Sequence, residues 1–73
     1  METEPLARAY ISAGMGGDVW MRPDPGQTLE AFQAVVAAAE AWEAIERIRI
    51  LEIREENQTG RRLIDAVRFR RLR

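Results

Sequence analysis

The sequence predicts one small α+β domain, residues 1–73, in which an antiparallel β-sheet carries one long helix across one face. Three observations predict it: an apolar pattern of helical period from Leu29 to about Glu46, two later segments of alternating polarity, and a turn-rich stretch between those segments. The order is ββαββ if residues 18–22 form a strand and βαββ if they form a loop. The sheet therefore has three or four strands.

Near the N-terminus, residues 6–13 alternate weakly between larger and smaller side chains, which predicts the first strand. Three glycines within residues 14–17 then favour a tight turn, because glycine accepts the positive φ values that such turns require. The β-prone segment 19–22 follows and is interpreted as a short return strand or a loop. Trp20, on this weak strand beside the glycine turn, is a candidate anchor for a partner.

The helix has a good N-cap in Thr28 and an acidic residue, Glu30, in its first turn. At 100° per residue, one arc collects the predicted core residues Leu29, Phe32, Val35, Val36, Ala39 and Trp42. The opposite side is rich in alanine, either because alanine is the best helix former or because this side packs on a second helix. The second reading makes four residues a self-association surface: Ala34, Ala38, Ala41 and Ile45.

The two halves of the chain carry opposite charge. Residues 1–46 sum to −6 and residues 47–73 to +5, and every basic side chain is an arginine. Such a division suggests a basic surface for nucleic acid or for an acidic partner, or two halves that attract one another.

Residues 47–54 and 63–70 predict a hairpin, with a break of alternation at Ile50-Leu51 that suggests a bulge. If the apolar side chains of the hairpin face the helix, four arginines point to the opposite side of the sheet: Arg47, Arg49, Arg68 and Arg70. These are candidate partner-binding residues, for an acidic protein or for nucleic acid, and the alternative is a face that meets only solvent. Arg47 is also four residues after Glu43, and we expect it to pair with that carboxylate while the helix lasts.

Little in the composition favours catalysis. The chain has no histidine, cysteine or lysine, so it lacks the usual general base, the thiolate nucleophile, the Schiff-base amine and the common zinc ligands. Residues 14–17 lack the lysine of a phosphate-binding loop and are followed by Asp18, which favours a turn. Acidic residues near position 55 lack calcium-loop spacing and fit a solvated hairpin tip. We expect no enzyme activity, no cofactor and no metal.

The sequence has no run of about 18 apolar residues, so we expect no membrane contact. The acidic start, residues 1–5, lacks the basic and apolar regions of a secretory signal, which favours the cytoplasm. The absence of cysteine also removes disulfides, and a small domain without such a staple often depends on a partner subunit. We therefore expect a homo-oligomer.

The second half, a helix followed by an antiparallel hairpin that ends near Phe69-Arg70, resembles dodecins, which are small flavin-storing shells. In that family an aromatic residue just after the helix stacks on flavin, whereas residues 48–50 here are Ile-Arg-Ile, so flavin is not expected. In its small size and its lack of a recognisable functional motif, the chain is also similar in type to accessory proteins of phages and mobile elements, including anti-CRISPR inhibitors.

These observations favour a non-enzymatic protein-binding module that self-associates, of the accessory or inhibitor type. The alternative is a nucleic-acid-binding protein that uses the arginine-rich hairpin.

Overall fold

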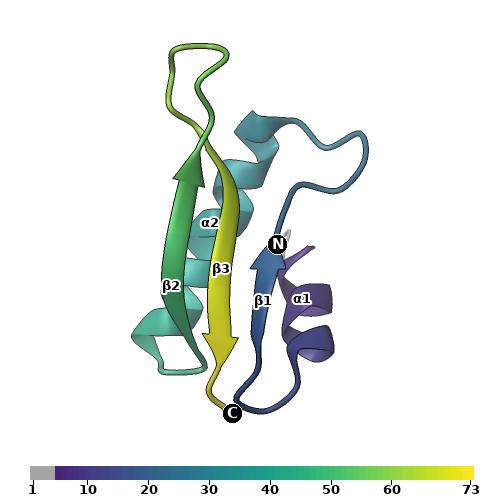
Figure 1. Ribbon diagram of the computed structural model, residues 1–73, viewed down its shortest axis with the longest axis vertical. Coiled ribbons are helices and arrows are strands. Elements are labelled where there is room, and N and C mark those ends of the chain that lie inside the picture. Colours follow the sequence, from purple (N-terminus) through teal and green to yellow (C-terminus); the bar gives the residue numbers. More distant parts are fainter. Residues whose placement is uncertain (1–4) are drawn as a thin grey trace.

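The computed structural model describes residues 5–73 and shows an α+β fold, as the sequence predicts (Figure 1). The elements in chain order are α1 (Leu6–Ala13), β1 (Asp18–Met21), α2 (Leu29–Ala44), β2 (Ile48–Glu55) and β3 (Ile64–Arg71). The acidic start of the chain, residues 1–4, lies outside the described part. Within residues 5–73, neither helix has the length and apolar content needed to cross a membrane.

The three strands form one antiparallel sheet in the order β1-β3-β2, so the C-terminal strand is central. Figure 1 shows α2 behind this sheet and α1 beside β1, while neither helix covers the front of the sheet. One face of the sheet is therefore packed against α2, and the other is left uncovered. We call the uncovered side the open face.

The core lies between α2 and the covered face. Phe69 of β3 is fully buried there, and its cross-strand neighbours are Val19 on one side and Ile50 on the other. The buried cluster also contains residues from both helices and all three strands, namely Leu6, Met21, Phe32, Val35, Val36, Ala39, Ile48 and Val67. Four residues of the predicted core arc are buried in the cluster, namely Phe32, Val35, Val36 and Ala39, and Trp42 is half-buried against it. Leu29, the first residue of that arc, is half-buried outside the cluster.

The predicted first strand is wrong, because residues 6–13 form the helix α1. This segment also fits a helical period: Leu6, Ala9, Tyr10 and Ala13 are spaced to lie on one side of a helix. Leu6 is completely buried, and Ala9 and Tyr10 pack against the core, so this side decides the conformation. The segment that the sequence left open, by contrast, is a strand, β1.

The beginning of α2 agrees with the sequence, since the Thr28 side chain accepts a hydrogen bond from the Ala31 N–H at 3.1 Å. The helix ends at Ala44, two residues earlier than predicted, and Glu46 takes a left-handed backbone conformation with φ of 62°. This turn redirects the chain into β2. In the hairpin that follows, the register shifts between Ile50 and Glu52, where the sequence predicts a bulge, and again between Arg54 and Glu55.

Candidate functional site

The open face is built from two rows of side chains that cross all three strands. Strand pairing places Asp18, Arg70 and Arg49 in the first row. It places Trp20, Arg68 and Glu52 in the second. Neighbouring positions on β3 point to opposite sides of the sheet, so Arg68 and Arg70 are on the side away from buried Phe69.

In the first row, charge is balanced at one end only. The Arg70 Nε donates to the Asp18 carboxylate at 2.8 Å, and this hydrogen bond lowers the pKa of Asp18 below its ordinary value. Arg49, at the other end, lies directly opposite Arg70. It has no side-chain partner within residues 5–73 and is exposed. The row therefore ends in a guanidinium group that lacks a carboxylate.

The second row combines an aromatic ring with a looser ion pair. The Arg68 Nε lies 3.8 Å from the Glu52 Oε1, too far for a hydrogen bond, and has no hydrogen-bond acceptor in the described part of the chain. Trp20 is half-buried beside Arg68, and the Arg22 guanidinium lies 5.2 Å from its ring centre. An aromatic platform thus adjoins the arginines.

Of the predicted partner-binding residues, the structure brings together Trp20, Arg49, Arg68 and Arg70. The fifth, Arg47, is elsewhere. It precedes β2, and its guanidinium carbon lies 4.4 Å from the Trp42 ring centre and 5.1 Å from that of Tyr10. The expectation that Arg47 shares the open face is therefore wrong, because Arg47 still belongs to the turn that ends α2, where its N–H donates to the Trp42 carbonyl at 3.0 Å after left-handed Glu46.

Arg47 belongs to a stack of arginine and aromatic side chains that joins α1, α2 and β3. The rings of Tyr10 and Trp42 meet edge to face at 5.1 Å, and Arg71 lies 4.2 Å from the Tyr10 ring centre. Burial raises the pKa of Tyr10, but the guanidinium groups of Arg47 and Arg71 outweigh it, so the net shift is downward. Arg47 and Arg71, two cations of the basic second half of the chain, thus contact aromatic rings of the domain itself.

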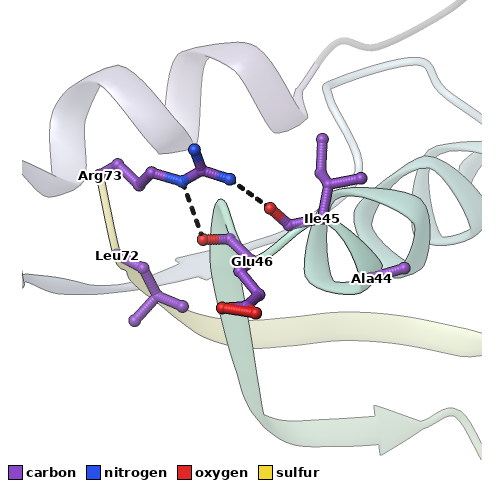
Figure 2. A pocket seen from close by; sticks show the side chains of 5 residues that line it. All are labelled: Ala44, Ile45, Glu46, Leu72 and Arg73. Carbon is purple, nitrogen blue, oxygen red and sulfur yellow. Dashed lines mark hydrogen bonds between the residues drawn. The ribbon is translucent and has the colours of Figure 1, made fainter.

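Arg73 is also engaged within the domain. Its guanidinium donates to the backbone carbonyls of Ile45 and Glu46 (Figure 2). Its own carbonyl accepts from the Tyr10 hydroxyl. A hollow of about 510 Å³ lies beside it, lined by Ala44, Ile45, Glu46, Leu72 and Arg73. Since the guanidinium bonds to both carbonyls, these polar groups of the lining are already engaged within the domain.

The predicted self-association surface lies on α2 and on Ile45, the residue that caps its C-terminal end. Ala34, Ala41 and Ile45 are exposed, whereas Ala38 is half-buried against the core. The alanine-rich side of α2 is therefore open to solvent over most of its length.

Glu43 does not form the predicted pair with Arg47, because its carboxylate instead accepts from the Ile50 N–H at 2.9 Å.

The hairpin tip is organised by a side chain that sequence reasoning missed. Glu56 is only 8% exposed, and its carboxylate accepts from the backbone N–H groups of Gln58, Thr59 and Leu63 and from the Thr59 hydroxyl. These hydrogen bonds lower the pKa of Glu56, and the bond from the Thr59 N–H has the largest effect. Burial acts in the opposite direction but does not cancel them. Its role is structural: within residues 5–73, no three acidic side chains are placed to hold a metal ion.

We expect Glu56→Gln to loosen this tip and to flatten the acid dependence of stability. The lowered pKa means that the ionised carboxylate stabilises the fold above its ordinary pKa of 4.5, and that this is lost as pH falls further. Thermal unfolding followed by circular dichroism should show a Tm at pH 7 lower by about 4–8 °C. The difference in Tm between Glu56→Gln and wild type should be smaller at pH 3 than at pH 7. Glu55→Gln is the control, because Glu55 is an exposed neighbour that has no side-chain partner among the described residues. An equal effect there would contradict the assignment.

Comparisons with protein-family models, with curated proteins and with solved structures find no match for this chain.

Proposed function

We propose that this chain is a non-enzymatic protein-binding module whose contact surface is the open face and whose partner presents carboxylates. The observation that carries the proposal is Arg49, an exposed guanidinium without a carboxylate partner among residues 5–73, directly opposite a second arginine on an uncovered sheet. Like charges in cross-strand positions repel. A carboxylate from a partner would relieve that repulsion and pair with the arginine fork.

The composition of the open face supports a protein partner. Tryptophan and arginine are the residues most enriched among those that dominate binding energy at protein interfaces. Here Trp20 and Arg68 are cross-strand neighbours, on a face that neither helix covers. The acidic Asp18 and Glu52 lie in the same two rows, each beside an arginine of β3, so a protein partner that carries carboxylates can also place a basic group opposite these two acids.

Nucleic acid is the second candidate, favoured by the same neighbours. An aromatic ring beside arginines on an open antiparallel sheet is the arrangement on which single-stranded bases stack. Two carboxylates within the rows oppose it, because a phosphate backbone carries one sign of charge only. The balance of three arginines against two acids therefore favours a protein.

A module of this kind acts by occupying a surface of a larger complex, which is how an inhibitor or accessory protein of a phage or mobile element works. The absence of histidine, cysteine and lysine from the chain supports a binding role over catalysis.

The proposal can be tested by selecting binders from a displayed random-peptide library on wild type and on the double variant Trp20→Ala/Arg49→Ala. We expect wild type to enrich peptides rich in aspartate and glutamate. The double variant should bind these peptides at least about tenfold more weakly. Arg62→Ala is the matched control, because Arg62 is an exposed arginine of the hairpin loop without a side-chain partner in the described part of the chain.

A single-stranded oligonucleotide titrated at several salt concentrations separates the two candidates. Affinity that falls steeply with salt and depends on Arg49 would favour the nucleic-acid function. Selected peptides that are not acidic, or that bind the double variant equally well, would refute the proposed protein partner.

A further inference from the structure

The outer edge of β2 is a strand edge that no other element in the described part of the chain pairs with. The sheet order places β1 and β2 at its two edges, and α1 packs beside β1. An unpaired edge presents backbone N–H and C=O groups that can add another strand. Which groups β2 presents follows from the hydrogen-bond pattern of its neighbour β3.

The backbone of β3 turns alternately to β1 and to β2. Arg71 bonds to Gly16 and Gly17, which precede β1, whereas the Leu72 N–H donates to the Arg47 carbonyl beside β2. In an antiparallel sheet the N–H and C=O groups of successive residues point to opposite neighbouring strands. Val67, four residues before Arg71, therefore directs its N–H and C=O toward β1. Ile53 is the β2 residue paired with Val67. The N–H and C=O of Ile53 therefore lie on the outer edge.

One part of this edge is already occupied. Ile50 pairs with Phe69, which also faces β1, so its N–H is directed outward, and the Glu43 carboxylate accepts it at 2.9 Å. Register shifts lie between Ile50 and Glu52 and between Arg54 and Glu55. The stretch Glu52–Arg54 lies between the two register shifts, and no side chain of residues 5–73 bonds to its outward backbone groups.

This stretch is complementary to itself in charge and in polarity. If two copies pair antiparallel about a two-fold axis through Ile53, Glu52 of each lies opposite Arg54 of the other. Arg54 has no side-chain partner within residues 5–73, and Glu52 has only its 3.8 Å contact with Arg68. Ile53, exposed by 43%, then meets its own copy across the axis.

We propose that a second copy of this chain adds to the outer edge of β2 through Glu52–Arg54, joining the two sheets into one continuous sheet. Across the axis, the N–H of each Ile53 donates a hydrogen bond to the C=O of the other Ile53. The second row of the open face then continues into the partner copy, in the order Trp20, Arg68, Glu52 and Arg54 of the second copy. The inference concerns a surface other than the proposed contact residues Trp20 and Arg49 and holds whether or not the open face has a partner.

The association should be weak, because the paired segment is short and its interface small. Sedimentation equilibrium of the full chain, up to about 1 mM, is therefore the measurement. Wild type should show a monomer–dimer equilibrium. Ile53→Pro should abolish it, since proline removes the outward N–H but is tolerated at a strand edge where no bond to β3 is lost.

Charge reversal gives the sharper test. Arg54→Glu places glutamates opposite glutamates, and Glu52→Arg places arginines opposite arginines, so each variant alone should dimerise at least about tenfold more weakly. Mixed together, the two variants should pair with each other, because every cross-strand contact then joins opposite charges. Far-ultraviolet circular dichroism of each variant checks that it is folded.

Two variants serve as controls with defined outcomes. Glu40→Arg, on an exposed residue of α2, and Trp20→Ala/Arg49→Ala on the open face should leave the equilibrium unchanged. A strictly monomeric wild type at 1 mM would overturn the inference. A dimer that survives Ile53→Pro but is lost in Ala41→Glu would also overturn it, and would assign self-association to the alanine-rich side of α2.

Discussion

Phe69→Ala should leave the domain largely unfolded at moderate temperature. Phe69 is completely buried at the centre of the middle strand, where it contacts the core from β3 with Val19 and Ile50 as cross-strand neighbours. Replacing a buried phenylalanine by alanine removes about 3–5 kcal/mol of stability. A domain of this length is expected to have only about 4–11 kcal/mol in total.

Thermal unfolding by circular dichroism measures this effect. The Tm of Phe69→Ala should fall by at least about 12 °C, since each kcal/mol shifts the Tm of so small a domain by about 4–8 °C. Ile11→Ala is the control, because Ile11 is 73% exposed and its truncation should change stability by no more than about 0.5 kcal/mol. A Tm for Phe69→Ala within a few degrees of wild type would mean that the packing of the sheet on α2 does not hold the molecule together.

Gly17→Ala is expected to have the second-largest effect. A Cβ atom at this position would collide with the Ala13 carbonyl oxygen and lie 3.1 Å from the carbonyl carbon, both of them backbone atoms at the end of α1. Neither side can easily move away. The Gly17 N–H donates to Gly14 at 3.1 Å, and the Gly17 carbonyl accepts from Arg71 at 2.9 Å.

Overpacking against backbone costs about 1–3 kcal/mol or more, and here it should separate α1 from β1. Urea unfolding gives the loss of stability, and amide hydrogen exchange should show faster exchange in α1 than in α2. Gly26→Ala is the comparison: Gly26 has φ of 83° with open space around it, so alanine there costs only the backbone strain of about 1–2 kcal/mol. A smaller effect at Gly17 than at Gly26 would contradict the close approach.

The helix and the hairpin could be predicted from the sequence because their signals are local. The cap at Thr28, the helical period of α2 and the β-branched alternation after Ile48 all lie within the elements they specify. Residues 6–13 were wrongly predicted because a short alanine-rich segment fits both periods, and only the burial of Leu6 and Tyr10 against distant residues distinguishes them.

The candidate site was predictable in part for the same reason. Arg49, Arg68 and Arg70 follow from the alternation of the hairpin, but the position of Trp20 beside Arg68 depends on the pairing of β1 with β3, which no local pattern encodes. Arg47 was misplaced because it still belongs to the turn that ends α2, after left-handed Glu46. Glu56 gave no signal, since its partners are mostly backbone N–H groups of its own loop.

The two tryptophans occupy separate parts of the molecule, which gives the protein two built-in fluorescent reporters. Trp42 lies among Tyr10 and Arg47 where the helices meet, so its emission should follow folding. Trp20 is on the open face, so its emission should follow occupancy of that face. Replacing either tryptophan by phenylalanine isolates the other signal, and binding can then be distinguished from unfolding in a single cuvette without any attached dye.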